Sequence, residues 1–186
     1  MAGFARDVPS PPDADAFRDW AWRQPEKCEF IDGKAFMMAG ASRLHGLIAG
    51  NIMGVLWNAL RGRRCGPFQS SLAVRVDSLN EFYPDLVVDC GDARDEATEP
   101  LLVVEVLSAS TEENDRGRKW AAYRRLRTLR HYMLVAQDQL MVELYTRNDV
   151  GWTLQVFETA DATVAIDGLD VSLRVAEIYE GVDLAA

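Results

Sequence analysis

The sequence predicts an α/β fold in which helices flank a central β-sheet. Two apolar runs rich in β-branched residues, 83–88 and 101–108, are typical of strands buried on both faces. A long amphipathic segment, 43–60, precedes them, and a second helical pattern follows them from residue 115. Because strands buried on both faces need cover on both sides, this order of elements favours a layered α/β domain.

Length and composition indicate one domain. The chain has 186 residues with 48% hydrophobic content, enough to bury a real core. We expect an N-terminal leader and short helix over residues 1–25 and a single domain over 26–186. No apolar run reaches the roughly 18 residues of a membrane helix, and the N-terminus lacks the order of a signal peptide. A soluble, cytoplasmic protein with no membrane partner is therefore expected.

The cysteines and the charges narrow the class further. Cys28, Cys65 and Cys90 form neither a metal-binding motif nor an even-numbered disulfide framework. We therefore expect all three to be reduced thiols that serve only in packing. The net charge of −9 argues against indiscriminate binding of nucleic acid. Residues 115–131, however, hold seven Lys or Arg against one acid, whereas 137–186 hold ten acids against two arginines. A basic segment is thus embedded in an acidic body.

The N-terminal third contains a short helix and a hairpin. After a loose leader at 9–12, Asp13 is expected to cap a helix that runs through Trp22. Segments 28–31 and 34–37 then predict a two-residue hairpin, because Asp32-Gly33 tolerates the positive φ values of a tight turn. Glu29 lies on this hairpin.

The long helix is capped by Ser42 and carries an unusual row of glycines, Gly46, Gly50 and Gly54. Glycines spaced by four lie on one helix face and weaken the helix, so we expect something to approach that face closely. Packing on the sheet of the same chain and a helix crossing between protomers are both open. His45 at the helix start is either a cap or surface residue or a residue near a site.

The remaining elements follow from turn residues and periodicity. Residues 61–67 are expected to form a loop and 71–76 a strand, and the turn-rich segment 91–100 joins the two buried strands as a hairpin. After the helix that starts near Asp115, the further expected elements are a strand at 133–136, a hairpin from 140–145 and 152–158 turning at Asn148-Asp149, and a short helix at 173–179. In the helix that starts near Asp115, Trp120, Tyr123, Leu126 and Leu129 are expected to face the core.

Each buried strand carries one carboxylate. If the two strands pair antiparallel around a symmetric loop, residue 90 faces 100 and Asp85 faces Glu105, with Cβ atoms roughly 5 Å apart. Two like charges in an apolar sheet are costly unless a cation neutralises them, which predicts a divalent metal. An arginine-paired or turn-capping couple is the structural alternative.

These residues bring a family resemblance into view. Pro84-Asp85 at the start of one strand, Glu105 near the end of the next and the order α-β-β-β-α-β resemble the PD-(D/E)XK nuclease superfamily, with its restriction-endonuclease-like fold and mixed sheet. More narrowly, 29–33, 84–88 and the block 104–111, followed by Asp115, Lys119 and Tyr123, resemble a bacterial family of putative restriction endonucleases. The resemblance covers about residues 26–182 and implies an N-terminal hairpin and a C-terminal β extension around the core.

The resemblance also implies a mechanism. In the superfamily a lysine stands two residues after the acid, where this chain has Leu107, and Lys119 on the next helix resembles the migrated lysine of the narrower family. Asp85, Glu105 and the carbonyl oxygen of Val106 would then hold Mg²⁺ or Mn²⁺ for phosphodiester hydrolysis, and Lys119 would orient the attacking water. Glu29 or His45 would complete the site.

Two functions follow as alternatives. The first is a metal-dependent endonuclease acting on DNA, with the basic helix along the backbone. The second is a catalytically inactive relative that retains the fold for nucleic-acid binding or assembly. For Lys119 and Glu29, solvated or structural roles stay open, and Ser108 and Thr111 are read as caps. The glycine row and the resemblance to dimeric nucleases suggest a homodimer.

Overall fold

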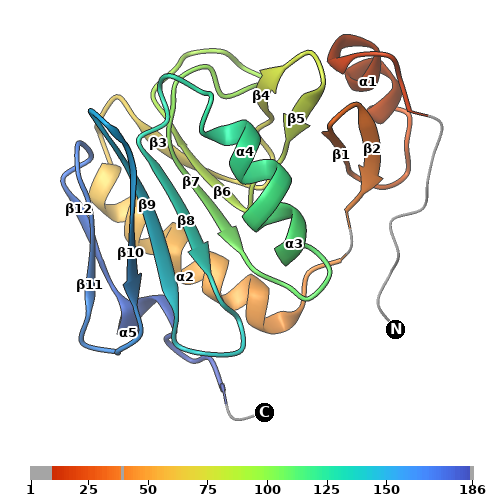
Figure 1. Cartoon of the computed structure of the whole chain (residues 1–186). Coiled ribbons are helices and arrows are strands. Elements are labelled where there is room, and N and C mark those ends of the chain that lie inside the picture. The colour runs from red at the N-terminus through yellow and green to blue at the C-terminus, as the bar shows by residue number, and fades with distance from the viewer. Residues whose placement is uncertain (1–9, 39, 185–186) are drawn as a thin grey trace.

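A six-stranded mixed sheet in the order β10-β9-β8-β7-β6-β3 forms the centre of the fold (Figure 1). The computed structural model describes residues 10–38 and 40–184. Strands β7 and β8 pair parallel, and the other neighbours in this sheet pair antiparallel. The strands are β3 Gly66–Gln69, β6 Leu86–Asp89, β7 Pro100–Val106, β8 His131–Val135, β9 Val142–Asn148 and β10 Gly151–Phe157. The α/β class and the central mixed sheet predicted from the sequence are confirmed.

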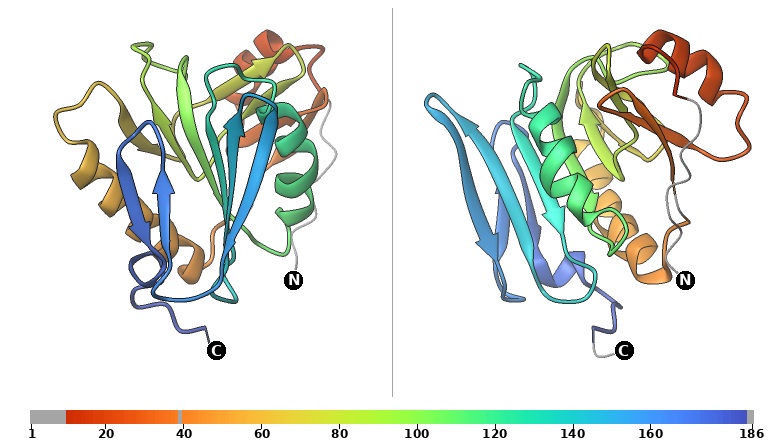
Figure 2. Two further views of the ribbon diagram at one scale, coloured as in Figure 1. Left: turned by 60° about the vertical axis from the view of Figure 1, so that its left-hand side comes forward. Right: turned by 45° about the vertical axis from the view of Figure 1, so that its right-hand side comes forward.

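Elements on both faces bury this sheet, and two hydrophobic clusters fill the space between the layers (Figure 2). One face carries α2 (Arg43–Leu60), the hairpin β11 (Thr163–Ile166) and β12 (Val171–Arg174), and α5 (Val175–Ile178). The other face carries α3 (Glu112–Asn114), the π-helix η1 (Asp115–Lys119) and α4 (Trp120–Tyr123). Cover on both sides explains why β6, β7 and β8 consist almost entirely of buried residues.

A smaller four-stranded sheet lies beside the central one, in the order β2-β1-β5-β4. Its strands are β1 Cys28–Ile31, β2 Lys34–Met37, β4 Val74–Asp77 and β5 Asn80–Phe82. Helix α1 (Ala14–Ala21) packs on it through the stacked rings of Phe17 and Phe30, whose centroids are 4.9 Å apart. This sheet supplies one wall of the candidate site, because Glu29 belongs to β1.

Local signals in the sequence are confirmed where capping or turn chemistry decides the conformation. Asp13 accepts a hydrogen bond from the Ala16 amide, and Ser42 accepts one from the His45 amide. Asp32 and Gly33 have φ values of 51° and 76°, as a tight hairpin turn requires. The leader expected at 9–12 lies partly outside the described residues.

Three element assignments differ from the prediction. Strand β3 lies partly inside the expected loop 61–67, and β4 turns back into β5 instead of leading into the central hairpin. The expected helix 173–179 is present but shorter: residues 173 and 174 belong to strand β12, and α5 covers only Val175–Ile178. Short strands with Gly, Pro or polar residues carry little periodicity, so tertiary pairing determines them.

The helix expected from Asp115 is shorter than predicted and partly π-helical. Its regular part ends at Tyr123, so Leu126 and Leu129 lie beyond it, although Leu129 is fully buried in the same cluster. Trp120 and Tyr123 do face the core, as expected. Single π-helical turns inside α-helices occur frequently at functional sites.

The prediction of three reduced cysteines was wrong. Cys65 and Cys90 form a disulfide, and Cys28 is free and buried. The register explains the bond: β3 pairs with β6 so that Gly66 faces Asp89, and the next residues outward are Cys65 and Cys90, with Cα atoms 4.0 Å apart. Because the sequence predicts a loop over 61–67, it offers no strand register that would bring these residues together.

The glycine row on α2 is also not packed on this chain. A Cβ atom at Gly46, Gly50 or Gly54 would meet nothing within 4 Å among the described residues, and all three positions are exposed. The expectation that the sheet of the same chain approaches this face is therefore wrong. The chain's own packing does not require these glycines.

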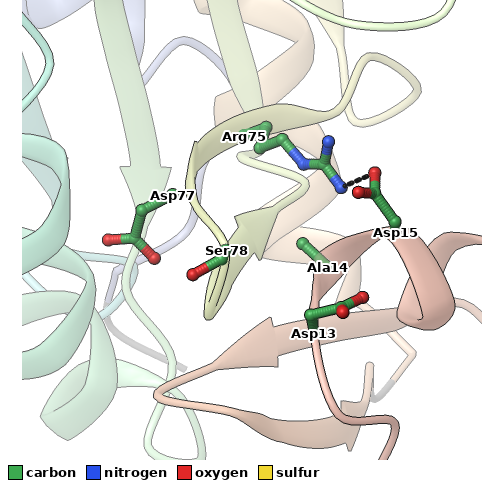
Figure 3. Close-up of a pocket in the computed structure, with 6 residues that line it drawn as sticks. All are labelled: Asp13, Ala14, Asp15, Arg75, Asp77 and Ser78. Carbon is green, nitrogen blue, oxygen red and sulfur yellow. Dashed lines mark hydrogen bonds and ion pairs between the residues drawn. The ribbon is translucent and has the colours of Figure 1, made fainter.

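No helix in the described part of the chain is long and apolar enough to span a membrane. A surface cavity of about 350 Å³ lies between α1 and the β4–β5 turn, lined by Asp13, Ala14, Asp15, Arg75, Asp77 and Ser78 (Figure 3). It contains none of the site residues expected from the sequence, and Asp15 is paired with Arg75 at 2.6 Å.

Candidate active site

Asp85 and Glu105 lie side by side on neighbouring strands. Leu86 faces Val104, so the register places Asp85 opposite Glu105, and the Asp85 amide is 3.4 Å from Glu105 Oε2. The pairing expected from a symmetric loop is thus present at this end of the strands. It fails at the other end, where a register shift after Val88 places Asp89 opposite Pro100.

Asp85 lies where the site reaches the surface. Its Oδ2 accepts a hydrogen bond from the Val106 amide at 2.7 Å and contacts His45 Nε2 at 3.0 Å. The side chains of Asp85 and His45 are each 16% exposed. Burial opposes protonation of His45, but the adjacent Asp85 carboxylate outweighs it and raises the pKa of the imidazole. The N-terminus of α2 therefore brings His45 to the candidate site, which agrees with the second of the two roles that the sequence leaves open for it.

Lys119 lies deeper, among three carboxylates. Its Nζ is 3.0 Å from Glu29 Oε2, 3.1 Å from Asp115 Oδ1 and 3.2 Å from Glu105 Oε1. The lysine and its three partners are all buried. Asp115 Oδ1 has no hydrogen-bond partner among the described residues, so its contact with Lys119 is ionic only. The structure thus joins Glu29, Glu105 and Lys119, which come from three distant parts of the sequence.

Burial and mutual charge set the protonation of this group. Burial disfavours the ammonium form of Lys119, but the surrounding carboxylates, Glu105 first, raise its pKa well above the ordinary value. Burial raises the pKa of Glu105 well above its usual range, and Lys119 only partly opposes this. The pKa of Glu29 is raised for the same reason. With all of its carboxyl groups ionised, the site would hold more negative charge than its one buried ammonium can neutralise, and the neighbouring carboxylates contribute to the raised pKa values of Glu105 and Glu29.

Two tyrosines fix the geometry around these carboxylates. Tyr123 donates its hydroxyl hydrogen to Glu105 Oε1 at 3.3 Å, and Tyr132 donates to the Asp115 carbonyl oxygen at 2.9 Å. Burial raises the pKa of the Tyr123 phenol well above its usual range, so it stays protonated and donates. In the sequence, Asp115 and Tyr123 stand out only as parts of the family pattern. Their spacing of four from Lys119 is the signal that places them on its helix face.

Lys27 is a cation near the site that sequence reasoning missed. Its ammonium lies 4.3 Å from the centroid of the Tyr83 ring, on the exposed side of the site. Burial lowers the pKa of Lys27, and the charges of Glu29 and Asp85 oppose that shift. Tyr83 in turn donates its amide to Glu29 Oε1 at 2.9 Å. No sequence pattern distinguishes Lys27 from a solvated lysine before a strand.

The donor set fits a hard divalent cation. Among the described residues, no group of three or more His, Cys, Asp or Glu side chains forms a preassembled metal cage. Mg²⁺, however, is usually bound through one or two carboxylates and keeps several waters. Asp85 and Glu105 offer two carboxylates, and the excess of negative charge would be offset by such a cation. The Val106 amide donates to Asp85. Because an extended residue presents its N–H and C=O groups on the same side of the strand, the Val106 carbonyl oxygen also faces the Asp85 strand, where it is expected to help hold the metal.

The basic segment is divided between ion pairs and exposed arginines. Arg116 pairs with Glu112 and Glu143, and Arg125 lies 2.7 Å from Asp77. Arg118 and Arg125 line a surface cavity of about 340 Å³. Its other lining residues are Asp32 and three small residues of η1 and α4, namely Gly117, Ala121 and Ala122. The further exposed arginines of this segment are Arg124, Arg127 and Arg130.

Comparison with known proteins places the chain in a family. The model of the Uma2 family, described as putative restriction endonucleases, matches residues 14–176. This chain belongs to that family. It is also similar to two uncharacterized proteins of Synechocystis sp. (strain PCC 6803): it is 35% identical to one over 174 residues, 90% of each chain, and 32% identical to the other over 137 residues, 69% of this chain and 77% of the relative.

A solved structure shows the same fold. The chain resembles a crystal structure described as a putative nuclease of the DUF820 group from Anabaena variabilis, with a TM-score of 0.73 over 91% of this chain and 98% of that one. The sequence identity is 18%, so this likeness speaks for the fold. Family and fold agree with the restriction-endonuclease-like superfamily, and the resemblance found in the sequence is confirmed.

Proposed function

We propose that this member of the restriction-endonuclease family is a divalent-metal-dependent endonuclease acting on DNA. The observation that carries the proposal is the position of Lys119. The chain lacks the lysine two residues after Glu105, yet a lysine from η1 reaches the Glu105 carboxylate at 3.2 Å. Glu105 is the strand neighbour of Asp85. An arrangement kept only for folding would not need a buried ammonium beside an acid pair that is itself costly to bury.

Each residue has a role that its position supports. Asp85, Glu105 and the Val106 carbonyl would hold Mg²⁺ or Mn²⁺, which supplies a water of lowered pKa and offsets charge on the scissile phosphate. His45 and the Val106 amide keep Asp85 turned toward Glu105. Tyr123 fixes one oxygen of Glu105, and Glu29 and Asp115 hold Lys119 against it. Lys119 then stabilises the negative charge that develops on the phosphate or its attacking water.

Substrate contact is expected on the exposed side of Asp85. Lys27 stands there with no carboxylate in direct ionic contact among the described residues, which suits contact with a backbone phosphate. The exposed arginines after α4 offer further sequence-independent phosphate contacts. The acidic remainder of the chain would limit indiscriminate residence on nucleic acid.

The direct test is cleavage of supercoiled plasmid, with structured RNA in parallel, in Mg²⁺, Mn²⁺ or a chelator. We expect nicking or linearisation of DNA that depends on the metal. In the same buffers, either metal should raise the melting temperature with the logarithm of its concentration above the dissociation constant.

The matched variant is Asp85→Asn with Glu105→Gln, which removes both carboxylates at nearly constant volume. It should lose cleavage and the metal-dependent thermal shift together, and its metal-free form should be at least as stable, because two repelling charges are gone. A thermal shift that persists in the double variant places the metal elsewhere. Absence of metal-dependent cleavage of either nucleic acid, with the thermal shift intact, would favour the inactive binding relative.

A further inference from the structure

The outer edge of β10 is an unprotected sheet edge. Among the described residues, β9 is the only strand that pairs with β10, and the β11–β12 hairpin forms a separate sheet. Figure 2 shows that hairpin stacked against a face of the central sheet, away from the continuation of its edge. The seven residues of β10 include five exposed ones, among them Leu154 at 44% and Val156 at 48%.

The opposite edge strand of this sheet, β3, and the edge strand β4 of the small sheet carry features that disfavour pairing with another chain. Strand β3 is four residues long and contains Pro67, and β4 contains Arg75 and Asp77. Strand β10, Gly-Trp-Thr-Leu-Gln-Val-Phe, contains neither proline nor any charged residue. An exposed edge of this length and composition is a template for a further strand.

The hairpin geometry identifies which backbone groups are free. The turn Asp149–Val150 leaves Asn148 opposite Gly151, and in a two-residue hairpin this closing pair is hydrogen-bonded. Because hydrogen-bonded and non-hydrogen-bonded pairs alternate, Thr153 and Gln155 bond to β9. The N–H and C=O groups of Trp152, Leu154 and Val156 therefore point outward.

We propose that β10 pairs antiparallel with β10 of a second copy of this chain, around a two-fold axis at Leu154. In that register Leu154 faces its own copy and Trp152 faces the partner's Val156, so each outward-facing residue meets another outward-facing residue. About six backbone hydrogen bonds then form across the interface. Leu154 also meets an apolar residue, and no like charges oppose each other on the strand, although each chain carries a net charge of −9.

The edge is rigid enough to serve as an interface. Trp152 packs against Trp120 with centroids 4.9 Å apart, and the Arg147 guanidinium lies 4.5 Å from its ring centroid. Arg147 itself donates to the carbonyl oxygens of Leu129, Arg124 and Leu126. A strand held in this way loses little conformational freedom on pairing. One strand pair is a small interface, so we expect a dissociation constant on the order of micromolar.

Sedimentation velocity from about 1 to 200 μM tests the proposal. The wild-type chain should pass from monomer to dimer in this range, and Leu154→Lys, which sets two ammonium groups together at the axis, should weaken the dimer by at least about tenfold. Trp57→Lys is the matched control, because Trp57 is an exposed apolar side chain on the glycine-bearing helix α2. It should leave the dimer unchanged.

Hydrogen exchange of the wild-type chain gives an independent reading. The amides of Trp152, Leu154 and Val156 should exchange fast in dilute protein and become protected at high concentration, while those of Thr153 and Gln155 stay protected throughout. A monomer at every concentration overturns the proposal. So does a dimer that survives Leu154→Lys, is lost in Trp57→Lys, or leaves the three outward amides unprotected.

Discussion

Lys119 has as many carboxylate partners as it has N–H groups to donate. Its ammonium carries three donors, and Glu29, Glu105 and Asp115 all lie within 3.2 Å of Nζ. Because the contact with Asp115 is ionic only, at most one N–H group remains for water or phosphate in this arrangement. If Lys119 is to donate more than that to the substrate, one carboxylate has to turn away from it, and Glu105 is the one that also faces Asp85.

Replacing Lys119 by methionine should therefore affect both stability and activity. Three buried carboxylates would lose their counter-charge, and we expect a loss of about 3–5 kcal/mol in the free energy of unfolding, on the scale of broken buried ion pairs. Cleavage at saturating DNA should fall by roughly 10² or more, as when a transition-state donor is removed. Urea denaturation and single-turnover kinetics measure the two effects separately.

Arg118→Met is the control for that substitution. Arg118 is the neighbouring residue on η1, but it is exposed, and its ion pair with Asp32 is long, at 4.0 Å. It should leave the free energy of unfolding and the rate at saturation nearly unchanged while weakening DNA binding and its salt dependence. A Lys119→Met protein that cleaves at the wild-type rate would leave the lysine a purely structural role.

His131 offers a pH test away from the site. Its Nε2 donates to the Asp167 carbonyl oxygen at 2.8 Å, so Nδ1 is left to accept from the Thr146 hydroxyl at 3.2 Å. This buried imidazole ties β8 to the loop between β11 and β12. Both ring nitrogens are in use, and the neutral form satisfies them.

Stability should fall when His131 is forced to take a proton. Burial lowers its pKa in the folded state, so the unfolded chain binds more protons as pH falls below about 6.5, the ordinary value for histidine. Stability contributed by the neutral imidazole is present above that pH and is lost below it. Melting temperatures at pH 7.5 and 5.5 should differ more for the wild type than for His131→Asn, and equal differences would contradict this account.

At the scale of single elements, sequence prediction succeeded where a local signal determines the structure. The Asp32-Gly33 hairpin and the capped helix α2 carry their turn and cap residues with them. Strands β3 and β5 have no such signal, because four and three residues are too few to show periodicity. The π-helical turn at Asp115–Lys119 follows from packing both side chains into the site, which no propensity encodes.

The glycines of α2 give a prediction at this scale. Gly50 lies inside an 18-residue helix and its missing Cβ would meet nothing within 4 Å, so Gly50→Ala should stabilise the chain by up to about 1 kcal/mol. Gly91→Ala is the contrasting variant, because a Cβ there would collide with the Thr98 side chain and crowd the Glu99 amide. Thermal melts should move in opposite directions. A destabilised Gly50→Ala protein would indicate that another chain packs on this face.

For the whole molecule, the disulfide is the feature that the sequence concealed. The segment between Cys65 and Cys90 contains β3, β4, β5 and β6, and with them Asp85. Closing a loop of 25 residues is worth about 3 kcal/mol in the chain-entropy description. Addition of dithiothreitol should lower the melting temperature accordingly, and Cys65→Ser with Cys90→Ser should remove this response. Cys28→Ser should retain it, since Cys28 is free.

The sequence points to only part of the candidate site. Asp85 and Glu105 stand out through both a charge argument and a family pattern, and Lys119 stands out through the family pattern alone. Lys27 was missed, since its place beside Tyr83 depends on how the small sheet docks on the large one. Whole-molecule packing of this kind has no counterpart in a local window of sequence.

The partners of Lys119 also bear on how the chain folds. Residue 29 belongs to the first hairpin, 105 to a strand in the middle of the central sheet and 115 to the helix after it. One ammonium therefore closes contacts that reach back as far as Glu29, 90 positions earlier in the chain (119 − 29). Contacts of such separation form late, because their loop-closure entropy is recovered only when the intervening strands are in place. A chain in which these three segments have not yet come together lacks the assembled site. In a refolding experiment, nuclease activity should therefore not be recovered before β1, β7 and the helix that follows it have packed together.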